Sequence, residues 1–241
     1  MLLALNVGNS NLVLGFWDGQ RWLHFTRVPS LEALPGNLPW DQVKSVMMSS
    51  VVPSQTEKVK SFIATKTGKP VTVLTSALYP KLPLQILSPT EIGTDLVANA
   101  MGAFTMCKQT CIVVDFGTAL TFTTISAKGK ILGVSIVPGL TSALKTLTQN
   151  SSALFEVPLE LPYSALGFNT PTAIQTGILL GYEGLVKNIV NKIRTELKED
   201  ALTIATGGGA HILTSLHDLF SLSTPTLALD GLRVIAHLAG V

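Results

Sequence analysis

Three short runs of apolar residues, separated by small polar turns, open the chain. Residues 2–7 (LLALNV), 10–19 (SNLVLGFWDG) and 20–28 (QRWLHFTRV) each have the composition of a β-strand. Asp18-Gly19 is a hairpin signal between the second run and the third. The pattern therefore predicts a three-stranded meander at the start of the chain.

Strands and helices alternate after this meander. Residues 43–54 predict a strand that enters a loop, and residues 69–75 predict another strand. Between them, residues 55–68 have the apolar spacing of an amphipathic helix, which Gly68 would end. A further helix is predicted over residues 93–107. The first part of the chain is thus an α/β unit.

The same order of elements is repeated in the second half of the chain. Three apolar runs, QTCIVVDFGT, ALTFTTISAKG and KILGVSIV, repeat the meander, with Lys128-Gly129 at the hairpin. ALTIATGGGA (201–210) later repeats the strand-to-loop role of VKSVMMSSVV. The sequence therefore predicts a duplication, in which two α/β halves, residues 1–109 and 110–241, have a cleft between them.

Helical segments fill the rest of the second half. PGLTSALKTLTQ is helical by its apolar spacing, and residues 172–200 form a long helical stretch. Thr170 is expected to cap this long helix, with Pro171 at its first position. Residues 230–240 predict a last helix.

Two glycine turns take the same place in the two halves. Gly8 in NVGNSN and Gly117 in VVDFGT each follow the first strand, and Asn6 and Asp115 each lie two residues before the glycine. Such a turn presents backbone N–H groups in a concave shape that suits phosphate oxygens. A carboxylate at the strand end can hold a cation directly or through water. Each turn alone could be an ordinary tight hairpin, so the nucleotide-binding hypothesis depends on the matched pair.

A glycine triplet strengthens that hypothesis. TGGGA (206–210) lies at the end of a predicted strand, where it would allow close backbone approach to a base or ribose. The more familiar phosphate-binding patterns, G-x-x-x-x-G-K-[ST] and G-x-G-x-x-G after a strand, are absent. The sequence therefore favours a nucleotide held between two matched turns.

Composition argues against several other classes of protein. Hydrophobic residues make up 46% of the 241 residues and charged residues only 13%, which indicates extensive burial and is compatible with a buried subunit interface. No apolar run is long enough for a membrane span, and MLLAL has the character of a first strand rather than of a signal peptide. With a net charge of +2 and no basic cluster, nucleic-acid binding is not expected. Cys107 and Cys111 are too few for a disulfide framework or a zinc site, so a reduced, cytoplasmic setting is expected.

Eight motifs resemble, in order, those of type III pantothenate kinases: NVGNSN, SSVVPS, IGTDLVANAMGA, VVDFGTALTF, GVSIVPGL, FNTPTAIQTG, TGGGA and PTLALDGL. The resemblance covers almost the whole chain. It implies the acetate and sugar kinase/Hsp70/actin fold, an α/β architecture in which two ribonuclease-H-like lobes carry mixed sheets. It also implies a homodimer that transfers the γ-phosphoryl group of ATP to the 4′-hydroxyl of pantothenate, the first step toward coenzyme A. Besides ATP, the implied cofactors are Mg²⁺ and a monovalent cation, K⁺ or NH₄⁺.

The resemblance also implies roles for individual residues. Asp95 matches the general base that takes the proton from the pantothenate hydroxyl, although an acid at this position could instead only stabilise the start of a helix. Asp115 matches the ligand of the monovalent cation. Nucleotide contacts are implied for Asn6, Gly8, Asn9, Ser10, Asn11, Gly117, Thr118, Gly207 and Gly208. Substrate contacts are implied for Gly93, Thr94, Leu96 and Thr170.

Three positions depart from the family pattern. Asn6 stands where the family has Asp, Leu96 where it has an Arg that pairs with the substrate carboxylate, and Ile86 where it has Tyr. Losing a preorganised charge at a transferring phosphate typically costs roughly two to three powers of ten in rate. A buried carboxylate without its partner costs on the order of 3–5 kcal/mol, or about two to three decades of affinity. Lys81 or another basic group could replace the missing cation.

Three functional hypotheses follow. The first is a cytoplasmic, dimeric pantothenate kinase-like phosphotransferase, which Asp95, Asp115, Thr118 and Thr170 favour. The second is a catalytically impaired relative that binds a nucleotide, a pantothenate-like molecule or a protein partner. The third is a kinase for a small hydroxylated substrate without a carboxylate, which Leu96 would suit.

Overall fold

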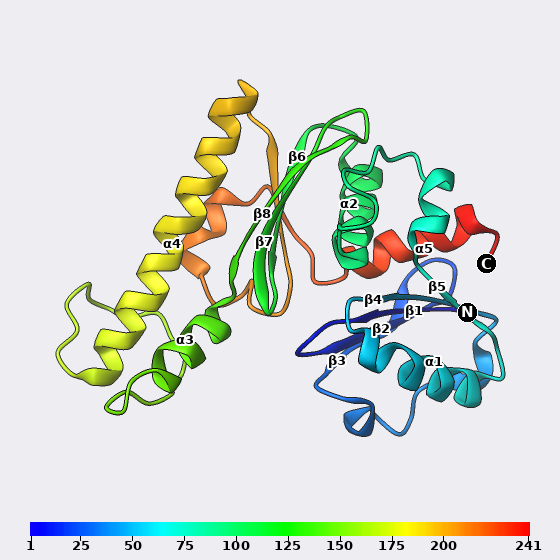
Figure 1. The fold of residues 1–241 in the computed structure, drawn as a ribbon, viewed down its shortest axis with the longest axis horizontal. Coiled ribbons are helices and arrows are strands. Elements are labelled where there is room, and N and C mark those ends of the chain that lie inside the picture. The colour runs from blue at the N-terminus through cyan, green and yellow to red at the C-terminus, as the bar shows by residue number, and fades with distance from the viewer. The chain divides into compact units, whose positions relative to one another are not determined.

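The computed structural model describes residues 1–241, which divide into two compact units (Figure 1). The first unit consists of residues 1–108, 125–132 and 226–241. The second consists of residues 109–124 and 133–225. These units differ from the halves 1–109 and 110–241 of the sequence, because the C-terminal segment packs within the first unit.

A five-stranded mixed sheet forms the centre of the first unit. Its strands are β1 (Leu2–Val7), β2 (Leu12–Trp17), β3 (Trp22–Val28), β4 (Ser45–Ser50) and β5 (Val71–Val73), in the order β3-β2-β1-β4-β5. The pairs β1–β2 and β2–β3 are antiparallel, whereas β1–β4 and β4–β5 are parallel. The predicted meander is thus confirmed, and β1 lies at the centre of the sheet.

The second unit repeats this sheet. Its strands are β6 (Cys111–Phe116), β7 (Ala119–Ile125), β8 (Ile131–Pro138), β9 (Leu202–Thr206) and β10 (Leu222–Ser223), in the order β10-β9-β6-β7-β8. The pairs β6–β9 and β9–β10 are parallel, as the pairs β1–β4 and β4–β5 are in the first sheet. The duplicated α/β fold with mixed sheets is therefore confirmed. The sequence pattern missed β10, because this strand has only two residues and both are exposed.

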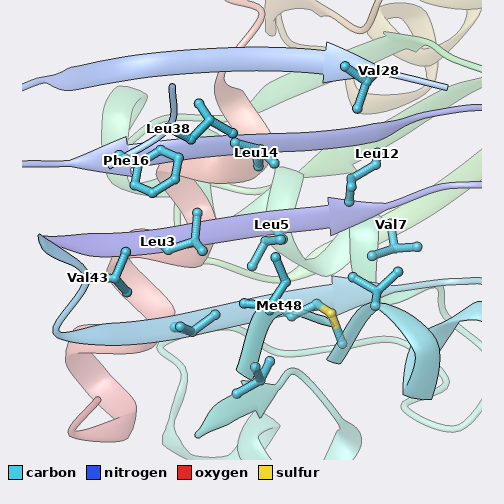
Figure 2. Close-up of a cluster of buried hydrophobic side chains, with 14 residues drawn as sticks. Leu3, Leu5, Val7, Leu12, Leu14, Phe16, Val28, Leu38, Val43 and Met48 are labelled. Carbon is cyan, nitrogen blue, oxygen red and sulfur yellow. The ribbon is translucent and has the colours of Figure 1, made fainter. Parts of the chain in front are cut away.

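One face of the first sheet packs against α1 (Pro53–Thr67). Alternate residues of β1 and β2 point into this core, where Figure 2 shows Leu3, Leu5 and Val7 beside Leu12, Leu14 and Phe16. Val59 and Ile63 of α1 belong to the same cluster. The helix ends at Gly68, which adopts a left-handed conformation with φ of +64°, as the sequence predicts.

The other face of the first sheet carries α2 (Thr94–Cys107) and α5 (Leu227–Ala239), which lie against each other in Figure 1. Two glycines let the helices approach closely. A Cβ on Gly102 would lie 2.5 Å from the carbonyl oxygen of Leu227, and a Cβ on Gly231 would overlap the carbonyl oxygen of Ala98. The C-terminal helix is thus packed backbone to backbone in the first unit.

The second unit is covered by α3 (Leu140–Gln149) and by the long helix α4 (Thr170–Leu197). Apolar residues of α4, among them Leu179, Val186 and Val190, pack on Ile112 and Phe122 of the sheet. Short 3₁₀ segments complete the fold at Leu31–Ala33, Trp40–Gln42, Ser76–Lys81 and Thr214–Leu219. None of the helices combines the length and the apolar character needed to span a bilayer.

The start of α4 corrects one prediction. Asn169, not Thr170, is the N-cap residue, because its side-chain oxygen accepts a hydrogen bond from the amide of Thr172 at 3.0 Å. The Thr172 hydroxyl in turn accepts a hydrogen bond from the amide of Asn169 at 3.2 Å, which completes a capping box. Thr170 is therefore the first residue of the helix and Pro171 the second.

Candidate active site

The first glycine turn lies between β1 and β2. The amide of Gly8 donates to the carbonyl oxygen of Asn11 at 3.0 Å, which closes the turn over residues 8–11. A Cβ on Gly8 would lie 3.3 Å from the same carbonyl oxygen, so a side chain would fit only if the turn yielded. Asn9 and Ser10 are exposed at the tip. The turn is therefore closed by its own backbone hydrogen bond and has an exposed tip.

The second glycine turn lies between β6 and β7. The amide of Gly117 donates to the carbonyl oxygen of Ala119 at 3.1 Å, and both Gly117 and Thr118 are exposed. The carbonyl oxygen of Thr118 accepts from the amide of Gly139 at 2.9 Å and from the hydroxyl of Ser142 at 2.7 Å. The N-terminus of α3 is therefore fastened to this turn.

The strand registers confirm that Asn6 and Asp115 are equivalent. Asn6 pairs with Ser49 across β1 and β4, and Asp115 pairs with Thr206 across β6 and β9. Each lies next to the last residue of its strand, two residues before a turn glycine. The two units thus place an amide and a carboxylate at the same point of the fold.

Asn6 has a feature that bears on cation binding. Its Oδ1 atom is buried and has no hydrogen-bond partner within the protein. Buried acceptors are nearly always satisfied, so an oxygen without a partner in the protein calls for a water or ligand to complete it. Amide oxygens can coordinate hard cations or accept a hydrogen bond from a metal-bound water. The residue therefore fits a neutral oxygen contact to a hydrated Mg²⁺ ion, without the charge of an aspartate.

Asp95 lies in the first turn of α2, after the N-cap residue Gly93 and the first helical residue Thr94. Its Oδ1 atom accepts a hydrogen bond from the amide of Leu96 at 2.8 Å. Surrounding protein atoms desolvate the carboxylate and raise its pKa above the ordinary 3.8, and the backbone amides of Leu96 and Asp95 offset only part of this rise. No lysine or arginine is among the groups that shift the pKa of Asp95.

Tyr79 is a neighbour of Asp95 that the sequence pattern missed. The residue is 6% exposed, and the pKa of its phenol is raised first by burial and then by the negative charge of Asp95. It lies in the 3₁₀ segment after β5, so its electrostatic interaction with Asp95 joins segments far apart in the chain and has no signal in the local sequence. Tyr79 is thus a largely buried residue whose phenol interacts electrostatically with Asp95.

Two departures from the family pattern, Leu96 and Ile86, and the basic residue Lys81 have different surroundings. Leu96 is only 8% exposed and is part of the apolar face of α2. Ile86 is partly exposed. Lys81 is exposed, and it is not among the groups that act on Asp95. No basic side chain is therefore among the groups that shift the pKa of Asp95.

The glycine triplet packs on the end of β6. Gly207 has φ of +91°, and a Cβ there would overlap the carboxylate of Asp115 and lie 2.6 Å from the amide nitrogen of Phe116. The amide of Gly209 donates to the carbonyl oxygen of Phe116 at 3.0 Å, while Gly208 is exposed. Gly207 is thus required for packing against Asp115, and Gly208 is the position open to a ligand.

Thr170 lies at a cavity in the second unit. The cavity has a volume of about 490 Å³. Its lining is mostly apolar and comes from Leu147, Leu154, Gly167, Phe168, Asn169, Thr170, Ala173, Ile174, Gly177 and Ile178. Thr170 and Asn169 are polar groups at its wall, so the predicted substrate residue borders a space large enough for a small molecule.

The two matched sheets define an α/β fold of the acetate and sugar kinase/Hsp70/actin class. A Campylobacter jejuni protein described as a conserved Baf family transcriptional activator is similar, with a TM-score of 0.64, 20% identity and coverage of 99% of this chain and 98% of that one. A Sinorhizobium meliloti protein described as a 2-dehydro-3-deoxygalactonokinase has a TM-score of 0.57, 11% identity and coverage of 99% of both chains. At these identities the likeness shows the fold alone.

Sequence relatives identify the family. The family model for type III pantothenate kinase matches residues 2–192. The type III pantothenate kinase of Syntrophotalea carbinolica is 33% identical over 249 residues, which cover 98% of each chain. That of Thermomicrobium roseum is 36% identical over 247 residues, covering 97% of this chain and 95% of its own. The chain belongs to the type III pantothenate kinase family.

Proposed function

We propose that this chain transfers the γ-phosphoryl group of ATP to the 4′-hydroxyl of pantothenate, the first step of coenzyme A biosynthesis. The observation that carries the proposal is the carboxylate of Asp95 at the start of α2, whose pKa is raised by burial. A base with a pKa closer to neutral accepts a hydroxyl proton more effectively. In phosphoryl transfer the protein acts mainly by positioning the groups and stabilising charge, and one oriented base is enough to direct the nucleophile.

The proposal assigns the other predicted site residues to contacts with the nucleotide or with pantothenate. The amides of Gly8 and Gly117 donate within their own turns, so the proposal gives the contacts to phosphate oxygens to other backbone amides of the two turns. Gly208 lies open for the approach of the base or ribose. Thr170 contacts the pantothenate. These assignments follow the positions that match the family motifs.

The cation sites of the proposal use oxygen ligands. Asn6 would contact a water of the Mg²⁺ bound to ATP through its free Oδ1 atom, and Asp115 would hold K⁺ or NH₄⁺ with its carboxylate. Mg²⁺ supplies positive charge to the β- and γ-phosphates when bound. Nowhere do three His, Cys, Asp or Glu side chains gather into a metal cluster. Since Mg²⁺ usually keeps several waters and binds substrate phosphates, the proposal gives most of its ligands to phosphate oxygens and water.

Substitutions at Asn6 and Leu96 test this function most directly. A coupled ADP-release assay with ATP, Mg²⁺, K⁺ and pantothenate compares the wild type with Asn6→Asp, Leu96→Arg and the double variant. We expect Asn6→Asp to raise kcat by roughly a hundredfold, because it restores a charge at the phosphates. Leu96→Arg is expected to lower KM for pantothenate by roughly a hundredfold, because it pairs the carboxylate.

The exposed residue Asn37 provides the matched control, since Asn37→Asp adds the same charge far from any predicted site residue in sequence. We expect no change in this variant. Wild-type turnover near the usual 1–100 s⁻¹ of kinases would mean that other groups compensate for Asn6 and Leu96. A double variant that is as inactive as a silent wild type would contradict the proposed reaction.

A second candidate is a kinase for a small hydroxylated substrate without a carboxylate. The observation that favours it is Leu96, which is buried and apolar at the position where the resemblance implies an Arg for the substrate carboxylate. A panel of uncharged alcohols in the same assay separates the two candidates. Turnover of an uncharged alcohol by the wild type, without turnover of pantothenate, would favour the second.

We also propose that the chain works as a cytoplasmic homodimer that pairs through α4. Gly177, Gly181 and Gly184 follow one another at helical spacing, and a Cβ at any of them would meet nothing within 4 Å. Phe168, just before this helix, is 67% exposed. A face of small residues beside an exposed aromatic ring would let α4 pack closely against the same helix of a second copy.

Substitution at the centre of this face tests the dimer. Gly181→Lys is expected to weaken self-association by roughly ten- to a hundredfold, because overpacking at a close contact typically costs about 1–3 kcal/mol. The measurement is the mass of the protein by light scattering over a dilution series. Gly36→Lys is the control, since a Cβ at Gly36 also meets nothing within 4 Å but lies in a loop. Equal dimer stability in both variants would contradict the interface.

A further inference from the structure

Two buried hydroxyl groups join the end of β4 to the start of α2. Ser49, which is fully buried, has its Oγ atom 2.8 Å from the Oγ1 atom of Thr94. The Thr94 hydroxyl donates to the carbonyl oxygen of Ser50 at 3.1 Å. A hydroxyl has a single proton, so Thr94 must accept from Ser49. The result is a one-directional chain from Ser49 through Thr94 to the backbone of β4.

These hydrogen bonds anchor the N-terminus of α2 to β4. The N-cap residue of α2 is Gly93, which has no side chain to accept a hydrogen bond from the first turn. Thr94, the first helical residue, is therefore fixed by its side chain to β4, and Asp95 follows it directly. A Cβ on Gly93 would lie 2.5 Å from Oδ1 of Asp95, so the carboxylate folds back over the helix start.

We propose that Ser49 is a positioning residue that holds the Asp95 carboxylate in place through the Thr94 hydroxyl. The proposal rests on the proposed role of Asp95 as the base. Because the proton of Thr94 is already donated to Ser50, its side chain serves the anchor rather than the substrate contact that the family motif implies. The side chain of Asp95 is itself held by the Leu96 amide of the same turn, so the carboxylate moves wherever that turn moves.

Stability and positioning respond differently to the loss of these hydroxyls. Thr94→Val keeps the shape of the side chain but leaves the buried Ser49 hydroxyl without its partner, which destabilises the fold. Removing both hydroxyls, in Ser49→Ala with Thr94→Val, leaves no buried hydroxyl without a partner. Only the carbonyl oxygen of Ser50 loses a donor, so much of the stability returns. The anchor stays lost in that double variant. A displacement of about 1 Å at a reacting group can cost roughly a hundredfold in rate.

The test is a double-mutant cycle with three readouts: the equilibrium constant of urea unfolding, kcat with ATP and pantothenate, and the titration of the Asp95 carboxyl carbon by NMR. We expect the double variant to regain most of the folding stability lost in Thr94→Val, while kcat stays reduced by roughly ten- to a hundredfold and KM for ATP is unchanged. The Asp95 titration is expected to move toward the ordinary aspartate value, because a loosened turn admits water.

A second hydroxyl pair on β4 provides the matched control. The Oγ atom of Ser50 lies 2.8 Å from Oγ1 of Thr56, which donates to the carbonyl oxygen of Val52 at 3.0 Å, so this pair anchors α1 instead of α2. Thr56→Val should lower stability without moving the Asp95 titration or kcat. Recovery of kcat together with stability in the double variant would overturn the proposal. If the wild type does not turn over pantothenate, the proposed function fails, and an unmoved Asp95 titration still separately overturns the anchor.

Discussion

Replacement of Asp95 by Asn is expected to lower kcat by roughly 10²–10⁴-fold and, at neutral pH, to raise the melting temperature. The rate falls because an amide cannot accept the hydroxyl proton, and general-base catalysis typically contributes a factor of that size. KM for ATP should change little, because Asp95 does not lie in either glycine turn. The variant keeps the shape of the side chain and its acceptor for the Leu96 amide.

The stability gain has a definite dependence on pH. Burial raises the pKa of Asp95 above the ordinary 3.8, so the folded protein binds this proton more tightly than the unfolded chain does. Stability is therefore lost as pH rises from 3.8 through the raised pKa, and the full penalty is present above it. The attraction of the helix N-terminus for a negative charge works in the opposite direction. Desolvation is the larger effect here, so the amide is the more stable side chain at pH 7.

Thermal unfolding of the wild type and Asp95→Asn near pH 3.5 and pH 7 measures this effect. We expect the two curves to coincide at the acidic pH and to separate at pH 7, by roughly 2–4 °C for each 1 kcal/mol of relief. Asp41→Asn, at an exposed position, should show no separation at either pH. A variant that is inactive but less stable at pH 7 would mean that the carboxylate supports the fold, as a residue that only stabilises the helix start would.

The architecture was accessible from the sequence because it repeats short-range patterns. The strand, glycine and strand order around Gly8 and Gly117 fixes the equivalence of Asn6 and Asp115, and the register of the parallel pairs confirms it. The helix stop at Gly68 is likewise a local signal, since a left-handed residue suits glycine. These features involve residues that are close in the chain, or two copies of one pattern.

The interactions of Asp95 and its helix turn could not be predicted from the sequence, because they join segments that are far apart in the chain. Ser49 meets Thr94 only when α2 folds onto β4, and Tyr79 approaches Asp95 from the segment after β5. The cap of α4 was missed by one residue for another reason. Asn169 and Thr170 are both good capping residues, and only the reciprocal bond with Thr172 decides between them.

Gly231→Ala is expected to destabilise the first unit by more than about 3 kcal/mol, because an added methyl group meets backbone rather than a movable side chain. A Cβ there would overlap the carbonyl oxygen of Ala98 and lie 2.9 Å from the amide nitrogen of Gly102. The helix α5 could not move freely to relieve the clash, since the indole of Trp22 in β3 donates to Asp230 of α5 at 2.8 Å. The expected fall in melting temperature is roughly 6–12 °C.

The comparison variant is Gly36→Ala, because a Cβ at Gly36 meets nothing within 4 Å and its backbone does not require glycine. Its melting temperature should equal or slightly exceed that of the wild type, since alanine restricts the unfolded chain. Gly231→Ala should also lose kcat beyond its loss of stability, because α2, which carries Asp95, packs on α5 at this point. A Gly231→Ala protein with wild-type melting temperature and kcat would show that the α2–α5 contact is looser than its backbone-to-backbone packing implies.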